Sequence, residues 1–223
     1  MKSIVLAGNA TTAEILYRYI GADARYALAG LTVDDAYLNA GARFDHPTVG
    51  FSALTQAFPP GAHAIVMAMG YDDVNETRRS MFERLRTIGY EIASYVHPHA
   101  MIHSEHPIGE GSVVLPGTVI EPHVRIGADS MIWSNVTLAH HSTVGDHCWV
   151  ASGAVVSGKA TIGDNCFIGV NATIVNAITL GHHVVVGGGA LLTRDAKDET
   201  VHLARSAEQI RYKSRDYAKY IGV

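Results

Sequence analysis

The sequence contains a histidine pair, His140-His141, whose position suits an imidazole that acts as a base. His140 lies two residues after an aliphatic residue, Leu138, and the residue eighteen positions later is Gly158. Imidazole has a pKa near neutrality and can remove a proton from an attacking hydroxyl or amine. If residues eighteen apart are stacked, the glycine leaves a groove beside His140 where an extended thioester cofactor could lie. The alternative is that His140 only lines a contact between subunits.

The remaining histidines and both cysteines favour structural roles. Pairs such as His97 and His99 suggest zinc, but zinc needs three or four convergent ligands, and no Cys/His spacing here is typical of such a site. We therefore predict no metal. Cys148 and Cys166 are predicted to be small buried side chains, not a disulfide or a metal pair. Several further histidines are expected to be solvated turn residues: His123, His147, His182 and His183.

A second candidate site follows the first apolar run of the chain. The turn Gly8-Asn9-Ala10-Thr11-Thr12 precedes a predicted helix, and Asp34-Asp35 and Gly70 follow two further apolar runs. In a parallel sheet such strand ends meet at one edge, and the N–H groups at a helix N-terminus bind phosphate. A vicinal Asp pair could accept hydrogen bonds from ribose or base. The alternative is a set of ordinary turns, and the absence of a GxGxxG motif argues against a dinucleotide site.

Strands alternating with helices predict a Rossmann-like parallel sheet in residues 1–95. Thr11 and Glu14 have the spacing of a capping box for the first helix. The expected strands are 2–8, a run ending at 30–35, 63–70 and 91–96, and the expected helices are 11–20 and 73–88.

An aliphatic residue recurs at every sixth position from Val96 to Leu192 without exception. The residue four positions later is usually small, and glycine often follows the aliphatic directly, which we interpret as a corner with unusual backbone angles. A period of six fits neither a helix nor a single strand. It predicts a left-handed parallel β-helix over residues 96–194, with three short strands in each eighteen-residue coil. Residues 195–223 form a tail with helical character over about 203–219.

The composition is that of an ordinary globular protein, with 48% hydrophobic and 17% charged residues. The net charge of −4 gives no reason to expect nucleic acid or an anionic membrane as a partner. The first residues predict a strand and not a signal peptide, and no apolar run reaches transmembrane length. With two cysteines in 223 residues, a cytoplasmic location is expected.

Residues 1–194 resemble the sugar O- and N-acyltransferases typified by sialic acid O-acetyltransferase and bacillosamine N-acetyltransferase. The order of the two domains, the Asp34-Asp35 pair and the segment SNVTLAHHSTVGDHCWVASGAVVSG (134–158) carry this resemblance. It implies a homotrimer that transfers an acetyl group from acetyl-CoA to a nucleotide-linked sugar, with His140 as the catalytic base. The residues implied in nucleotide-sugar binding are Ala10, Thr11, Thr12, Asp34, Asp35 and Gly70, and those implied in acetyl-CoA binding are Trp149, Gly158, Val170 and Gly188.

The chain departs from that family in three places. The first turn reads GNATTA where the family has a glycine-rich turn with a histidine, and the C-terminal tail replaces a short GxPA-type end. His141 stands where the family commonly has Glu or Asp to orient the base, so His141 is also a catalytic candidate. We expect an acetyltransferase of a nucleotide-linked, amino sugar in bacterial surface glycan synthesis. The alternatives are an O-acetyltransferase of a free sugar such as sialic acid and an inactive trimer that binds a nucleotide sugar.

Overall fold

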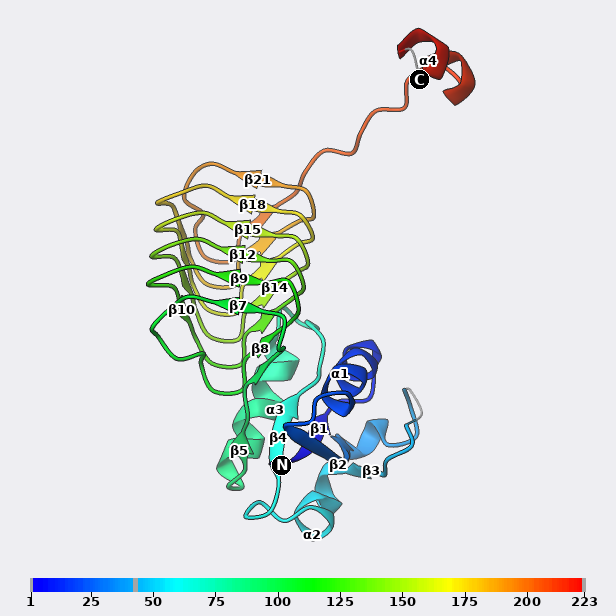
Figure 1. Ribbon diagram of the computed structural model, residues 1–223, viewed down its shortest axis with the longest axis vertical. Coiled ribbons are helices and arrows are strands. Elements are labelled where there is room, and N and C mark those ends of the chain that lie inside the picture. Colours follow the sequence, from blue (N-terminus) through cyan, green and yellow to red (C-terminus); the bar gives the residue numbers. More distant parts are fainter. Residues whose placement is uncertain (1, 42–43, 222–223) are drawn as a thin grey trace.

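The computed structural model describes residues 2–41 and 44–221, which form an α/β part, a stack of short-stranded coils and a C-terminal tail (Figure 1). The α/β part contains a five-stranded parallel sheet of the order β3-β2-β1-β4-β5. Its strands are β1 (Lys2–Ala7), β2 (Tyr26–Val33), β3 (Thr48–Gly50), β4 (Ala64–Met67) and β5 (Glu91–Ile92). Its helices are α1 (Thr11–Gly21), α2 (Leu54–Ala57) and α3 (Glu76–Thr87), with short 3-10 turns η1 (Asp35–Tyr37) and η2 (Phe51–Ala53).

Alternate residues of β1 bury opposite faces of this sheet, as the period of a strand requires. Ile4 and Leu6 pack in the layer of α1, whereas Val5 and Ala7 pack in the layer of α2 and α3. The predicted capping box at the start of α1 is wrong. Ala10 is the N-cap and no side chain caps the helix, so Thr11 is already its first residue. The N–H groups of the first turn therefore remain available to a ligand.

The second part of the chain is a stack of two-residue parallel strands that confirms the predicted hexapeptide coils and has a left-handed β-helix arrangement. One sheet has the order β22-β20-β17-β14-β11-β8-β6, another β21-β18-β15-β12-β9-β7 and the third β10-β13-β16-β19. The strands are β6 (Tyr95–Val96), β7 (Met101–Ile102), β8 (Val113–Val114), β9 (Val119–Ile120), β10 (Arg125–Ile126), β11 (Met131–Ile132), β12 (Thr137–Leu138), β13 (Thr143–Val144), β14 (Trp149–Val150), β15 (Val155–Val156), β16 (Thr161–Ile162), β17 (Phe167–Ile168), β18 (Thr173–Ile174), β19 (Thr179–Leu180), β20 (Val185–Val186), β21 (Leu191–Leu192) and β22 (Val201–His202). Pairing changes from the first sheet to the coils between Ile92 and Tyr95, and it continues to His202.

The six-residue aliphatic ladder forms the interior of the coils. Its members from Val114 to Leu192 belong to one buried cluster, and Val96 and Ile108 pack against that cluster. Ile102 is the exception at the open end, where 36% of it is exposed. Cys148 and Cys166 are free and buried in the same column, as predicted, and each thiol donates to a carbonyl of the next coil.

The corners differ from the prediction in the residue that takes the unusual backbone angles. From Ile108 to Val186 the left-handed residue is the third after the aliphatic, and Asn, Asp and His are frequent there because they tolerate positive φ. Glycines directly after the aliphatic, such as Gly163, have no positive φ. They are small because the next coil is close: a Cβ on Gly163 would lie 2.6 Å from the oxygen of Gly181.

A buried polar network joins α3 to the coils. Arg78 has no exposed surface, and its guanidinium donates to both carboxylate oxygens of Asp129 at 3.2 Å. The same guanidinium donates to the oxygen of His147 at 2.8 Å, and the His147 ring bonds Asp129 at 2.9 Å. His147 is therefore a buried partner of this network, which corrects its predicted role as a solvated turn residue. The side chain of Asn75 donates to the Cys166 carbonyl at 3.2 Å.

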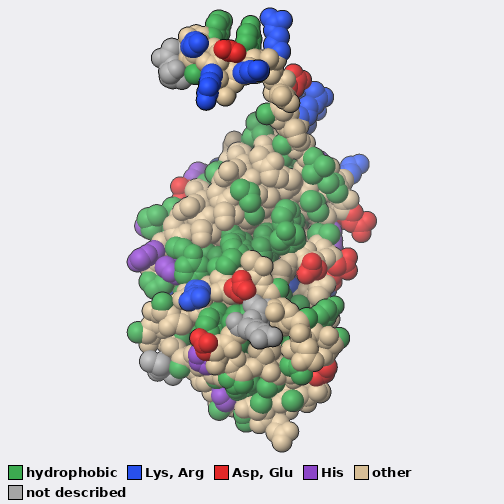
Figure 2. Space-filling model, turned by 90° about the vertical axis from the view of Figure 1, so that its right-hand side faces the viewer, with side chains coloured by type: hydrophobic (Ala, Val, Ile, Leu, Met, Phe, Trp, Pro, Cys, Tyr) green, Lys and Arg blue, Asp and Glu red, His purple; other side chains and the backbone are tan. Residues whose placement is uncertain are grey.

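The tail leaves the coils as an extended segment and ends in a short helix, α4 (Ser214–Ile221) (Figure 1). The helix is shorter than the predicted segment 203–219 and begins eleven residues later. Tyr212, Tyr217 and Tyr220 in the tail are exposed. Figure 2 shows Lys and Arg side chains on the tail and hydrophobic side chains gathered across the middle of the face of the body below it.

Candidate active site

A cavity of about 410 Å³ opens at the carboxyl ends of β1, β2 and β4. Its lining comes from the turns after these strands and from the start of α3: Gly8, Asn9, Ala10, Val33, Asp34, Tyr37, Ala68, Met69, Gly70, Asp72, Thr77 and Met81. Ala10, the uncapped N-cap of α1, is among the lining residues. Free N–H groups at a helix N-terminus are suited to a phosphate. The cavity thus combines a turn with free backbone N–H groups and carboxylates that can accept hydrogen bonds.

The predicted binding residues of this part divide between the cavity and its surroundings. Ala10, Asp34 and Gly70 line the cavity. Thr11 is exposed and Thr12 is buried in α1, and neither is a lining residue. Asp35 faces away and accepts a hydrogen bond from the Ser52 hydroxyl at 2.7 Å. A Cβ on Gly50 would collide with its carboxylate.

Asn9 belongs to the predicted turn, but the sequence assigns it no role of its own. Its amide donates to the oxygen of Tyr37 at 3.0 Å and to that of Ala40, which ties the turn after β1 to the segment after η1. Asp72, in the turn before α3, and Thr77, in the first turn of α3, also line the cavity. Their signal in the sequence is their position after the fourth strand, beside the predicted Gly70.

His140 lies at an exposed corner of the coils, directly over a glycine of the next coil. A Cβ on Gly158 would lie 2.6 Å from Cε1 and 2.7 Å from Nε2 of the imidazole, so only glycine leaves room for the ring there. The backbone N–H of His140 donates to Glu121 at 2.7 Å, which fixes the corner. Nδ1 of His140 lies 3.2 Å from Nδ1 of His141. The structure thus brings His140, His141 and Gly158 together. In the described part of the chain, residues 2–41 and 44–221, Nε2 of His140 has no hydrogen-bond partner.

His141 lies beside an imidazole–carboxylate pair, His123 and Glu105. The His141 ring lies 4.5 Å from the ring of His123, whose Nδ1 is 2.6 Å from a carboxylate oxygen of Glu105. Its own backbone N–H and His123 lower the pKa of Glu105 to about 2, so this carboxylate is ionised at neutral pH. The pKa of His141 lies below the usual value because desolvation and then the charges of His123, His140 and Lys159 disfavour the imidazolium. His141 is therefore a neutral ring at neutral pH.

The four predicted cofactor residues lie at three separate places in one chain. Gly158 lies under His140, in the corner after β15. Val170 and Gly188 lie in successive coils at another corner, where a Cβ on Gly188 would be 3.3 Å from the Val170 oxygen. The Trp149 ring is buried, and its centroid lies 4.9 Å from that of Tyr71. The structure thus gives Trp149 a packing role between the two parts, and its contact with acetyl-CoA stays a prediction.

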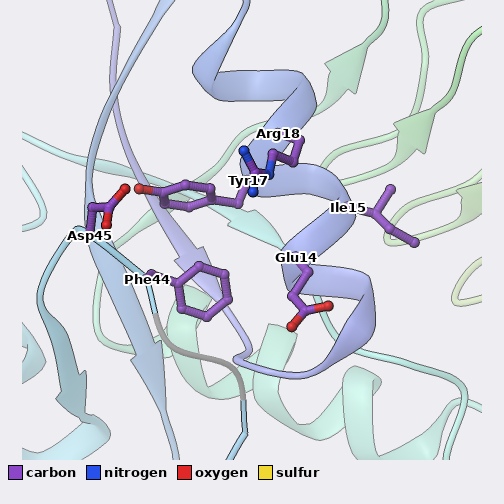
Figure 3. A pocket seen from close by; sticks show the side chains of 6 residues that line it. All are labelled: Glu14, Ile15, Tyr17, Arg18, Phe44 and Asp45. Carbon is purple, nitrogen blue, oxygen red and sulfur yellow. The ribbon is translucent and has the colours of Figure 1, made fainter.

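A second cavity, of about 500 Å³, lies on the outer side of α1 (Figure 3). Tyr17 extends from the helix toward Asp45, with Phe44 beside it, and the Tyr17 hydroxyl lies 2.6 Å from Nδ1 of His46. None of the predicted site residues lines this cavity.

Within residues 2–41 and 44–221, no group of three or more His, Cys, Asp or Glu side chains is placed to hold a metal ion. The predicted independence from metal remains a prediction. No helix in this same part of the chain has the length and apolar character needed to cross a membrane.

Two repeat families match the coils. The bacterial transferase hexapeptide family (six repeats) matches residues 108–140, 123–158 and 141–176, and the hexapeptide repeat of succinyl-transferase matches residues 159–194. No curated protein matches the chain by sequence.

Solved structures with both parts of the fold match nearly the whole chain. A mutant of perosamine N-acetyltransferase from Caulobacter crescentus, in complex with CoA and GDP-perosamine, matches at a TM-score of 0.82 and 23% identity over 92% of this chain and 94% of that one. WeeI from Acinetobacter baumannii AYE matches at a TM-score of 0.78 and 21% identity, over 93% of this chain and 99% of that one. The acetyltransferase domain of PglB from Neisseria gonorrhoeae FA1090 matches at a TM-score of 0.63 and 22% identity, over 94% of this chain and 100% of that one. These matches show the fold, and the repeats of the coils are those of bacterial transferases.

Proposed function

Because the coils carry the hexapeptide repeats of bacterial transferases, we propose that the chain is an acetyl-CoA-dependent acetyltransferase of a nucleotide-linked amino sugar. The observation that carries the proposal is His140: an exposed imidazole over Gly158, with Nδ1 beside His141 and Nε2 directed away from that contact. Amino-sugar specificity is supported by the similar perosamine N-acetyltransferase, which was crystallised with CoA and GDP-perosamine. A role in surface glycan synthesis and a cytoplasmic location stay predictions from the sequence.

The chemistry assigned to His140 is general base catalysis. Nε2 takes a proton from the sugar amine as its nitrogen attacks the thioester carbonyl, the new N–C bond forms and the C–S bond breaks. CoA leaves as a thiolate and takes up the proton that His140 carries, which restores the neutral base, and the developing oxyanion is stabilised by a backbone N–H. His141 fixes the tautomer of His140, because a hydrogen bond at Nδ1 determines which nitrogen keeps its lone pair.

We assign nucleotide binding to the Rossmann-like N-terminal part. The cavity near Ala10 has the helix N-terminus for phosphate and Asp34 for hydrogen bonds from ribose or base. Acetyl-CoA would lie along the coils, where Val170 and Gly188 are stacked. This division predicts that the two ligands are recognised by different parts of the chain.

The arrangement of these residues favours a homotrimer. In one chain, His140 and Gly158 are at one corner, whereas Val170 and Gly188 are at another, and the lining of the nucleotide cavity comes from residues 8–81. Packing three parallel coils around a threefold axis would bring different corners of neighbouring subunits together. Light scattering should give about three times 23.9 kDa. A monomer at micromolar concentration would contradict a site shared between subunits.

The decisive experiment is an assay of acetyl transfer from acetyl-CoA to GDP- and UDP-linked 4-amino sugars, in which release of the CoA thiol is measured. His140→Ala should lower kcat by roughly 100- to 10,000-fold. Its melting temperature should be nearly unchanged, because the ring is exposed and outside the aliphatic core. His182→Ala, a histidine at a different corner, is the matched control. Transfer to free sialic acid but not to any sugar nucleotide would replace the proposed substrate, and full turnover in His140→Ala would reject the base.

A further inference from the structure

Four side chains that follow one another at intervals of eighteen residues lead along one corner of the coils to the base. They are Glu105, His123, His141 and Lys159, and we call them the corner ladder. His123, His141 and Lys159 have nearly the same left-handed backbone, with φ of 65°, 62° and 61°. Because the corner repeats in each coil, their side chains start from equivalent positions and meet their neighbours in the coils before and after.

The ladder begins at a firmly held carboxylate. One oxygen of Glu105 lies 2.6 Å from Nδ1 of His123, and the other accepts the backbone N–H of His123 at 3.1 Å. The Nε2 of His106 is 3.3 Å from the first oxygen. The pKa of Glu105 is lowered to about 2 by its own backbone N–H and by His123. An ionised carboxylate accepts only, so His123 must present a protonated Nδ1 to it.

His141 lies between two ladder members that oppose its protonation. The His123 ring is 4.5 Å away at an angle of 42°, and Lys159 stands in the following coil. Desolvation is the largest cause of its lowered pKa, followed by His123, His140 and Lys159, while Glu105 acts in the opposite direction. Glu121, at the same corner, bonds the backbone of His140 and not this ring.

The protonation of His141 decides whether His140 can act as a base. A neutral His141 with a lone pair at Nδ1 accepts from Nδ1–H of His140, 3.2 Å away, and Nε2 of His140 then keeps its lone pair. An imidazolium at position 141 donates from both nitrogens. Nδ1 of His140 would then have to accept, and the proton of neutral His140 would move to Nε2, where the acceptor amine should lose its own.

We propose that His123 is a positioning residue for the base: anchored by Glu105, it holds His141 as a neutral ring that accepts the Nδ1–H of His140. The proposal rests on the proposed function only in the role of His140 as base. In the resembled family a carboxylate follows the base in sequence. Here a neutral imidazole accepts the hydrogen bond instead, and the carboxylate that anchors its neighbour His123 is two coils away, at Glu105.

The first test is independent of activity. Nitrogen-15 NMR of the imidazole rings, in the full-length protein without substrate, reports the tautomer of His140 and the titration of His141. His123→Asn removes the ring but keeps a residue that tolerates the left-handed backbone. The pKa of His141 should rise, because one of the groups that oppose its protonation is removed, and the Nδ1–H tautomer of His140 should lose population. An unchanged titration of His141 in His123→Asn would overturn the proposal.

The second test is the pH dependence of kcat. If the pKa of His141 rises in His123→Asn, then on acidification His141 becomes protonated at a higher pH in the variant than in the wild type. The neutral ring that accepts the hydrogen bond of His140 is then lost earlier. We expect kcat to fall roughly threefold or more at about pH 6 and less than about twofold at about pH 8.5. Loss by the same factor at every pH would show a purely structural role and reject the proposal.

The matched control is His182→Asn, which removes a histidine whose Nδ1 lies 3.3 Å from the Asp164 carboxylate, at a different corner. Its pH profile should be that of the wild type, and a shift of the same size there would contradict a specific role for His123. Absence of acetyl transfer in the wild type would reject the proposed function alone. The NMR titration would still decide whether His123 controls His141.

Discussion

The sharpest consequence of the stacked corner is that a single methyl group at Gly158 should disable the base. Gly158 is buried and its φ is outside the left-handed region, so its backbone accepts alanine. The added Cβ would lie 2.6 Å from Cε1 and 2.7 Å from Nε2 of His140. Nonbonded heavy atoms are normally about 3.5–4.0 Å apart, so the ring must retreat by about 1 Å. That movement breaks the 3.2 Å contact with His141.

The expected effect is catalytic and not structural. Misplacing a catalytic group by about 1 Å can cost roughly 100-fold in rate, and we expect kcat of Gly158→Ala to fall by about that factor. The His140 ring is exposed, so its movement opens no cavity in the aliphatic core. The free energy of unfolding should therefore change by less than about 1 kcal/mol.

Steady-state kinetics and chemical denaturation of three alanine variants test this reasoning. Gly163→Ala should lose about 1–3 kcal/mol of stability, because its Cβ would lie 2.6 Å from the backbone oxygen of Gly181, which cannot turn aside. Gly61→Ala, whose Cβ would have nothing within 4 Å, should change neither quantity. Gly158→Ala with unchanged kcat and a raised KM for acetyl-CoA would show that the glycine serves the cofactor and not the base. Unfolding of that variant would refute the premise that the ring can move.

The remaining predictions concern the orienting ring, the buried ion pair and the two aspartates. His141→Asp, which suits the left-handed backbone, should keep activity. The acidic limb of its pH profile of kcat should move to higher pH, because a carboxylate raises the pKa of the neighbouring His140 imidazole. Arg78→Ala should destabilise the protein by about 3–5 kcal/mol in urea denaturation, because Asp129 stays buried without its cation, and a loss below about 1 kcal/mol would contradict that burial. Asp34→Ala should raise the KM for the sugar nucleotide and leave that for acetyl-CoA nearly unchanged, whereas Asp35→Ala should affect the nucleotide KM less, because its carboxylate is bonded to a serine hydroxyl.

The coils could be predicted from the sequence because their core is local and repetitive. Each aliphatic meets the equivalent residue of the next coil, so the period alone specifies both the register and the interior. The corner geometry was harder, since glycine can mark either a left-handed residue or a close approach of another backbone. Gly163 is an example of the second, and Gly153, with a φ of 72°, is an example of the first. Only the position relative to the aliphatic residue separates the two cases.

The ion pair between α3 and the coils had no sequence signal. Arg78 lies on a helix with several exposed arginines, and Asp129 lies at a corner where Asp is common because it tolerates positive φ. Each residue has an ordinary local explanation, and their pairing depends on how two parts of the chain dock. Local periodicity therefore cannot predict which arginine of a helix pairs with an acidic residue of another part of the chain.

The candidate site, too, could be predicted only in part from the sequence. Spacing brought His140 and Gly158 together correctly, because eighteen residues is one coil and the stacked position follows from the period. The same rule applied twice more would have led from His141 to His123 and Glu105, yet a sequence reading that looks for a carboxylate next to the base stops at position 141. In a stacked coil a side chain also has neighbours eighteen residues away, as His123 does on both sides. The group that orients a catalytic residue should therefore be sought along the column of a corner as well as along the chain.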